Sequence, residues 1–316
     1  PTFSITPGAR VEWIDTQSEG SYIRVVRDLA GNVLLREEVA ENLQNRRAFA
    51  LGGVGLSYKP LAALELYGNF SMNYRAVHFN DLRVVNVNER VDENLQDERG
   101  YNADLGLRGQ HKGWLSYDVT AFLLRYDDRI GNVLREDTTL FNLYRFRTNV
   151  ADARTLGIES YLQAEVLHFF PRLKQDWRLK LFANATGLTA EYVDADEPAI
   201  DGNEVELVPP FILRTGATLR WRQLALSYQY SYTSSHYSDA TNAEQTPTAV
   251  ECRIPAYGVM DLTASYQWRW FKLSASCNNL LDRAYFTRRA SGYPGPGILP
   301  ALGRTFFATL QFQWPQ

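Results

Sequence analysis

Residues 305–314 read Thr305-Phe306-Phe307-Ala308-Thr309-Leu310-Gln311-Phe312-Gln313-Trp314. Apolar and polar side chains alternate along this stretch, with Phe307 the one apolar residue on the polar side. Successive side chains of a β-strand point to opposite faces of a sheet, so one face here is apolar and the other contacts water. The stretch therefore predicts a strand that separates an apolar medium from an aqueous one and ends in aromatic residues.

The composition allows this strand to belong to a membrane protein. The chain has 316 residues, of which 45% are hydrophobic and 22% charged. No run approaches the ~18 consecutive apolar residues of a membrane-spanning helix. A membrane β-barrel alternates lipid-facing and lumen-facing residues, so its average hydropathy resembles that of a soluble protein. The formal net charge of −3 gives no reason to expect a nucleic-acid partner.

The same period-two pattern recurs along the whole chain and predicts 12 strands. Several are about 10–14 residues long, whereas ~9–11 residues suffice to cross a bilayer at a tilt. The predicted strands are 3–14, 46–58, 62–75, 102–110, 114–127, 155–166, 177–189, 211–222, 224–233, 260–268, 271–280 and 303–314.

The connections between these strands alternate in length. The short ones lie near 59–60, 111–113, 171–176, 222–223 and 269–270. The long ones span roughly 15–45, 77–98, 129–147, 190–209, 237–254 and 287–302, and are rich in polar residues, Gly and Pro. Short turns at one rim and long loops at the other are typical of an antiparallel transmembrane barrel of the bacterial outer membrane, with the long loops outside the cell.

The tryptophans support this interpretation. Six of the seven are predicted at the short-turn rim, and Trp13 falls near the opposite rim. Membrane proteins place aromatic belts at the interface between lipid and water, whereas a soluble sandwich scatters its Trp through the core. We therefore predict a membrane-interface girdle made of Trp114, Trp177, Trp221, Trp268, Trp270 and Trp314.

Two motifs lie near the C-terminus: residues 279–288 read Asn-Leu-Leu-Asp-Arg-Ala-Tyr-Phe-Thr-Arg, and Gly303-Arg304 opens the last strand. This pair resembles the C-terminal end of TonB-dependent outer-membrane receptors. Upstream, Arg154-Thr155-Leu156-Gly157-Ile158-Glu159 resembles the Arg-x-x-Gly-[Val/Ile]-Glu strand of that family, and Val208-Pro209 and Arg253-Ile254-Pro255 resemble its Pro-marked descents from loops. Within the family, residues 285–288 and 253–255 are most similar to the ferric citrate receptor group.

This resemblance implies an N-terminal plug domain followed by a 22-stranded barrel. Residues 1–316 are then expected to form the C-terminal portion of the barrel, with the plug and the first ten strands outside this chain. It also implies uptake of a ferric chelate, a siderophore or ferric citrate, into the periplasm of a Gram-negative bacterium. The implied partners are the chelate, a TonB-type periplasmic energy transducer that acts through the N-terminal region, and the lipid and lipopolysaccharide of the outer membrane. No cofactor is implied.

Arginine suits an anionic chelate because its guanidinium can bind a carboxylate in a bidentate manner. Deep lumen-facing cations such as Arg108 and Arg178 are expected to pair with carboxylates or with the plug. Arginines near the outer rim and one loop tyrosine are the candidate ligand-binding residues: Arg75, Arg83, Arg90, Arg135, Arg145, Arg147, Arg288, Arg289 and Tyr293. For any one of these arginines, a solvated charge or a lipopolysaccharide contact is the commoner role. The last loop, 291–297, offers few polar side chains, which argues against ferric citrate itself.

No catalytic or metal-binding constellation is predicted. The four histidines lie in separate segments without metal-ligand spacing. Asp127-Asp128 and residues 194–197 read as solvated loop charges or as sites for divalent ions that bridge lipopolysaccharide. Register places Cys277 opposite residue 262, far from Cys252, so no disulfide is expected between them.

Three alternatives remain open at this point. A complete 12-stranded passive channel is geometrically allowed. A structural, adhesion or lipopolysaccharide-binding barrel is compatible with the long loops. An outer-membrane hydrolase is disfavoured, since no His lies on an outward-facing strand position beside a plausible Ser. We therefore expect a non-enzymatic protein.

Overall fold

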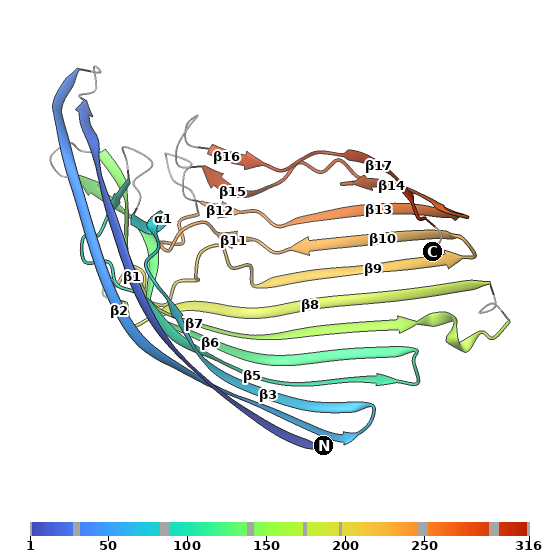
Figure 1. Cartoon of the computed structure of the whole chain (residues 1–316). Helices are drawn as coiled ribbons and strands as arrows, with labels where there is room; N and C mark the ends of the chain where they lie inside the picture. The colour runs from blue at the N-terminus through green and yellow to red at the C-terminus, as the bar shows by residue number, and fades with distance from the viewer. Residues whose placement is uncertain are drawn as a thin grey trace.

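The computed structural model describes residues 2–27, 32–82, 89–137, 142–172, 176–195, 198–244, 252–290 and 297–314. The chain folds into one large sheet that curves into a trough (Figure 1). Within the described residues no helix is long and apolar enough to cross a membrane.

Twelve strands follow one another in chain order, each antiparallel to the next. They are β1 (Phe3–Arg27), β2 (Val33–Leu61), β3 (Leu64–Arg75), β5 (Glu98–His111), β6 (Leu115–Asp137), β7 (Asn142–Glu165), β8 (Trp177–Val193), β9 (Phe211–Trp221), β10 (Leu224–Thr233), β13 (Tyr257–Trp268), β14 (Phe271–Asn278) and β17 (Thr305–Phe312). The 12 predicted strands are thus confirmed. In the described part of the chain β1 and β17 are the two ends of the sheet.

Smaller elements lie in the long connections. They are the helix α1 (Phe79–Leu82), β4 (Glu89–Val91), the 3-10 helix η1 (Val166–Phe169), β11 (His236–Tyr237), β12 (Arg253–Ile254), β15 (Phe286–Ala290) and β16 (Gly297–Pro300). β11 pairs with β12, β15 pairs with β16, and β4 runs parallel to β7. None of these elements was predicted, because each is too short to show a period.

Two expected loops are wrong. Residues 15–45 were expected as a connection, but β1 and β2 continue as a hairpin of 25- and 29-residue strands. Residues 129–147 likewise belong largely to β6 and β7, of 23 and 24 residues. Alternation of apolar and polar residues reports a lipid face, and it ends where the strands rise above the lipid, although backbone pairing continues. The β1–β2 hairpin projects beyond the rest of the sheet (Figure 1).

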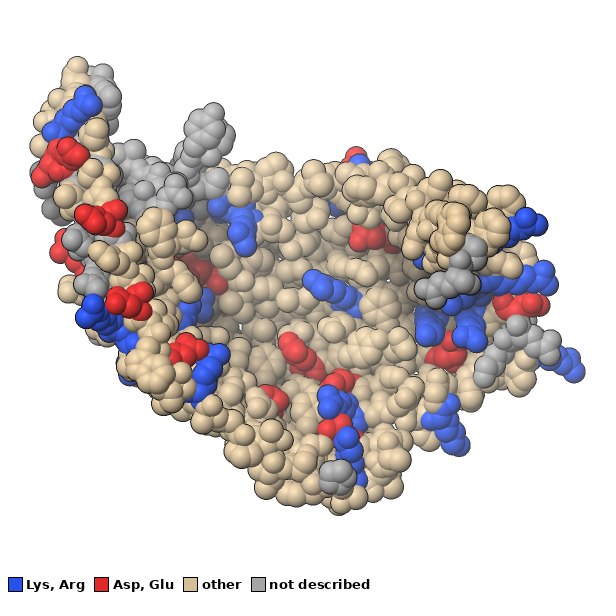
Figure 2. All heavy atoms as spheres, viewed as in Figure 1, with Lys and Arg blue, Asp and Glu red and all other residues tan. Residues whose placement is uncertain are grey.

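The register places one set of side chains on each face. Along the inner face Glu65 is opposite Arg108, which is opposite Asp118. Arg108 Nε donates to Glu65 Oε2 at 3.0 Å, and Tyr67 Oη donates to Asp118 Oδ1 at 2.6 Å. Figure 2 shows such charged side chains inside the hollow of the sheet. Arg108 is therefore paired with a carboxylate, as predicted. Arg178, for which the same pairing was predicted, lies opposite Arg220 in the register.

The opposite face is apolar over a height that matches a bilayer. On β8 the outward row begins at Trp177 and stays uncharged to Thr189, roughly 40 Å along the strand or about 30 Å of height at a tilt of ~40°. The next outward residue, Glu191, forms an ion pair with Arg154. Large apolar side chains elsewhere on this face are exposed, including Leu105, Ile158 and Leu310. This pattern is that of a transmembrane barrel wall.

Cys277 lies opposite Leu262, as the predicted register requires. Cys252 and Cys277 are both free thiols.

Candidate ligand pocket at the outer rim

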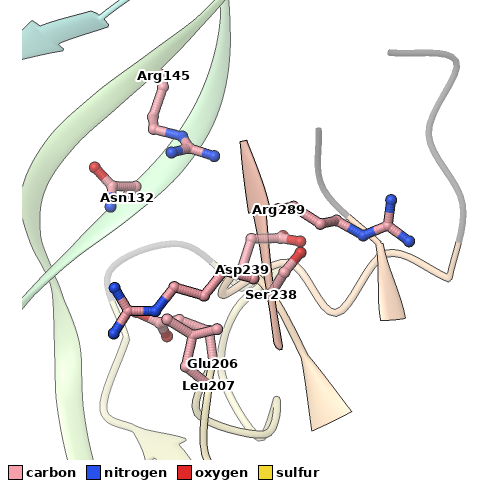
Figure 3. Close-up of a pocket in the computed structure, with 8 residues that line it drawn as sticks. Asn132, Arg145, Glu206, Leu207, Ser238, Asp239 and Arg289 are labelled. Atoms are coloured by element: carbon pink, nitrogen blue, oxygen red, sulfur yellow. The ribbon is translucent and has the colours of Figure 1, made fainter. Parts of the chain in front are cut away.

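A small pocket forms where four of the long connections meet. Its volume is about 140 Å³. The β6–β7 hairpin, the β8–β9 connection, the β10–β13 connection and β15 each contribute two residues: Asn132 and Arg145, Glu206 and Leu207, Ser238 and Asp239, and Arg288 and Arg289. Figure 3 shows Ser238 and Asp239 between Arg145 and Arg289 in that view. The pocket thus joins segments that are far apart in the sequence.

The wall of this pocket is held by a hydrophobic core within the connections. Tyr192, Ile200, Val205 and Ala240 are 0–2% exposed and pack in one cluster. Backbone hydrogen bonds link the same connections, such as Leu207 N to Tyr237 O at 2.8 Å. Buried apolar packing and satisfied backbone groups make loops rigid. The pocket is consequently a built feature of the fold rather than a gap between mobile loops.

The lining carries an excess of positive charge. Three arginines and two carboxylates leave a formal charge of 3 − 2 = +1. Glu206 accepts a short hydrogen bond from the Tyr192 hydroxyl, and burial raises the pKa of Tyr192. Asp239 Oδ1 accepts hydrogen bonds from the Thr241 hydroxyl and, at 2.9 Å, from its backbone N–H. Guanidinium groups around a small cavity favour carboxylate or phosphate ligands.

Of the predicted ligand-binding residues, the structure brings three together in this pocket: Arg145, Arg288 and Arg289. Arg83 and Tyr293 lie outside the described residues. The remaining four arginines lie elsewhere, in contacts that hold the connections.

Arg75 and Arg147 anchor the β3–β5 connection. Arg75 forms ion pairs with Glu98 and Asp81, each at 2.8 Å. Arg147 Nη1 donates to the backbone oxygens of Asn80 and Asp81 at 2.8 and 3.0 Å. Both guanidinium groups therefore have structural partners.

Arg90 and Arg135 contact aromatic rings instead. The Arg90 guanidinium lies 4.1 Å from the centroid of Tyr144, and that of Arg135 lies 4.3 Å from the centroid of Phe146. Cation–π contacts of this kind stabilise by about 0.5–2 kcal/mol. The Arg90 contact holds β4 beside β7, and the Arg135 contact joins the two strands of the β6–β7 hairpin.

Two of the acidic residues considered as cation sites, Asp127 and Asp194, pair with an arginine, and residues 196–197 lie outside the described residues. Arg125 forms ion pairs with Asp127 at 2.8 Å, Asp152 at 2.6 Å and Asp194 at 3.5 Å. Among the described residues, no group of three His, Cys, Asp or Glu side chains has a geometry that could hold a metal ion.

The six predicted girdle tryptophans lie at the short-turn rim. Trp177 and Trp221 are cross-strand partners whose rings stack at 5.4 Å. Trp270 occupies the turn between β13 and β14, and its backbone oxygen accepts from Gln313 N at 2.7 Å. Trp114, Trp268 and Trp314 flank the ends of β6, β13 and β17.

The Asn279 motif is a structural clasp. Asn279 is 3% exposed, and its side-chain NH2 donates to Arg283 O at 2.9 Å and Leu302 O at 3.3 Å. Its Oδ1 accepts from Arg283 N at 2.9 Å. Asp282 Oδ1 accepts from Arg304 N at 2.8 Å. The two side chains tie the end of β14 to the start of β17.

Comparison with known proteins identifies the family to which this sheet belongs. The family model described as "TonB dependent receptor-like, beta-barrel" matches residues 1–280. The chain belongs to this family. TonB-dependent receptor barrels are outer-membrane proteins of Gram-negative bacteria, and this family consists of receptors and transporters. No curated protein matches the chain in a sequence search.

Solved structures share the fold of this TonB-dependent receptor barrel. The copper transporter OprC matches with a TM-score of 0.74 at 17% identity, over 98% of this chain and 47% of its own. The siderophore receptor PiuA from Acinetobacter baumannii gives 0.71 at 18%, over 98% and 41%. The unliganded ferric citrate transporter FecA gives 0.70 at 16%, over 99% and 43%. The chain thus spans less than half of these structures, and their similar scores do not single out the ferric citrate group.

Sequence reasoning missed five of the eight lining residues: Asn132, Glu206, Leu207, Ser238 and Asp239. Asp239 followed by Thr241 fits a side-chain-stabilised turn, which is the one local signal that it carries. A turn signal does not identify a binding residue, because the pocket arises from contacts between distant connections.

Proposed function

We propose that the protein is an outer-membrane receptor that takes up an anionic ferric chelate into the periplasm, and that residues 1–316 form the C-terminal portion of its barrel. The open ends of the sheet at β1 and β17 support the second part, since unpaired strand edges are not tolerated in lipid. Further strands are then needed to close the wall. A closed 12-stranded channel is disfavoured for the same reason.

The pocket formed by Arg145, Arg288 and Arg289 carries the proposal for the ligand. Iron chelates bind iron through oxygen donors, and many carry carboxylates that a guanidinium can bind. The eight lining residues include no Cys, His or Met, which are the side chains that bind copper directly. The pocket therefore suits the anionic periphery of a chelate better than a bare metal ion.

Energy for release would come from a periplasmic transducer that acts on a plug domain outside this chain. The Trp rim faces the periplasm in this arrangement, and the pocket faces the cell exterior. Ferric citrate and other carboxylate siderophores are the first chelates to test.

Uptake of ⁵⁵Fe-labelled chelates by iron-starved cells tests this function. Cells that carry the full-length receptor should accumulate label from at least one anionic chelate, and deletion of the energy transducer should abolish accumulation. Equal accumulation in cells with and without the receptor gene, across a panel of carboxylate, catecholate and hydroxamate chelates, would contradict the proposal.

A further inference from the structure

The inner face of β8, β9 and β10 carries only positive charge. Cross-strand partners share a face, and the register runs from Asp118 on the inner face through Tyr161 and Asn184 to Arg214. Alternation from these positions places Glu191 of β8 on the outer face, and β10 has no charged residue. The other charged residues of β8 and β9 all lie on the inner face: Arg178, Lys180, Arg214 and Arg220.

These four cations lack the carboxylate partners found elsewhere on the wall. Arg108, on the inner face of β5, pairs with Glu65 at 3.0 Å. Within the described part of the chain, no ion pair or side-chain hydrogen bond joins any of the four to another residue, and all four are exposed. Arg178 even lies directly opposite Arg220, and like charges in this position repel each other. An anion bound between them would relieve this repulsion.

The cations lead from the pocket toward the opposite rim. The β8–β9 connection lines the pocket and enters β9 at Phe211. At ~3.3 Å per residue, Arg214 lies about 10 Å along β9 from this point and Arg220 about 30 Å. Lys180 is opposite Thr218 and so lies between them. Figure 2 shows Lys and Arg gathered at the end of the hollow where β8 and β9 meet the short-turn rim.

A row of exposed cations suits an anion in transit. A single exposed charge contact is weak, and a series of weak sites lets an ion enter and leave each one in turn. Pores that select anions use Arg and Lys side chains in this manner. The paired Arg108 offers no such site, because Glu65 already neutralises its guanidinium. The wall thus presents one path for anions, along β8 and β9.

We propose that a carboxylate chelate released from the pocket reaches the periplasm along the inner face of β8 and β9, and that Arg214, Lys180 and the Arg178–Arg220 pair bind it in succession. This inference rests on the proposed function and adds a route to it. The row of cations raises the local concentration of the anionic chelate along one wall of the lumen. A protein segment whose carboxylates stay docked on the same cations is the competing explanation, and it predicts a different experimental result.

The double variant R178Q/R220Q removes the two facing cations. In iron-starved cells with the full-length receptor, its maximal rate of ⁵⁵Fe-citrate uptake should fall about tenfold, the combined effect of two exposed charge contacts. Affinity for ferric citrate, titrated on the purified receptor, should stay unchanged, because the pocket lies several Debye lengths away. R178K/R220K keeps both charges and should retain most of the uptake rate.

The matched control K272Q removes an inner-face cation on β14, three strands away from β9. Its uptake should equal that of the wild type. Unchanged uptake in R178Q/R220Q, or an equal loss in K272Q, would overturn the proposal. A loss that comes with a lower unfolding midpoint and is not restored by R178K/R220K would also overturn it, because this result would show a docked protein segment.

Failure of the route and failure of the receptor function give different results. Uptake of other chelates by the wild type, but not of ⁵⁵Fe-citrate, would overturn the carboxylate route and leave the receptor function standing. Absence of uptake from every chelate of the panel would reject the receptor function and the route together.

Discussion

Asn279 offers the sharpest test of how the last strand is held. Replacement by Ala removes three side-chain hydrogen bonds, two donated to Arg283 O and Leu302 O and one accepted from Arg283 N. At about 1 kcal/mol each, their loss costs ~3 kcal/mol. Asn279 also has a φ of +51°, a left-handed conformation that costs Ala about 1 kcal/mol more than Asn. The expected total is about 4 kcal/mol for Asn279→Ala.

The matched control is Asn279→Gly, which loses the same hydrogen bonds but accepts the positive φ without strain. It should cost about 3 kcal/mol. Hydrogen exchange measured by mass spectrometry on the full-length receptor reports this locally, over a peptide that covers residues 279–290. Since ~1.4 kcal/mol is tenfold in an equilibrium constant, protection of the Arg283 amide should fall about 1,000-fold in the Ala variant and about 100-fold in the Gly variant.

A peptide from β8 and β9 should exchange as in the wild type, because the clasp does not contact these strands. Unchanged protection at Arg283 in both variants would refute the assignment of Asn279 as a clasp. Equal loss in the Ala and Gly variants would refute the strain argument alone.

Two further predictions concern the wall and the rim. A Cβ at Gly106 would lie 2.4 Å from Tyr67 Cζ, so Gly106→Ala should lower the free energy of unfolding by about 1–3 kcal/mol, measured by urea unfolding from lipid vesicles. The control Gly52→Ala adds a Cβ that meets no atom within 4 Å and should unfold like the wild type. Equal unfolding midpoints for the two variants would contradict the close approach of Tyr67 to Gly106. Trp177 and Trp221 should lie at the lipid–water interface. In variants that keep only these two tryptophans, lipids brominated close to the headgroup should quench Trp fluorescence more strongly than lipids brominated at the chain end. The reverse order would show that these residues do not belong to the girdle.

The membrane-spanning part of the fold follows from local sequence alone. An apolar environment on one face forces period-two alternation, and each of the 12 strands shows it over the stretch that faces lipid. The same reasoning stops at the outer rim. Along β1, residues 15–21 are polar on both faces, so the pattern disappears there while Asp15 still pairs with Arg46 and Glu19 with Asn42. Backbone pairing alone produces no period-two pattern where the side chains on both faces of a strand contact water.

The pocket shows the same limit at the level of single residues. Chemistry alone selected arginines in the outer loops, and three of them line the cavity. It did not separate Arg145 from Arg147, two residues apart on β7, of which one reaches the pocket and the other binds backbone oxygens of α1. Asp239 was missed because it meets the arginines only through the contact of connections that are distant in the sequence. Such properties depend on which connections lie side by side.

The most direct test of the central claim is the affinity of the full-length receptor for an anionic ferric chelate, measured by titration with and without the pocket arginines. The Arg288→Ala/Arg289→Ala double variant removes two of the three guanidinium groups and should weaken binding at least tenfold, since each charged hydrogen bond contributes about 1.5–3 kcal/mol. The control Arg46→Ala removes an exposed arginine that pairs with Asp15 on the β1–β2 hairpin, and it should bind like the wild type. Unchanged affinity in the double variant would contradict the assignment of this pocket as the site of ligand capture.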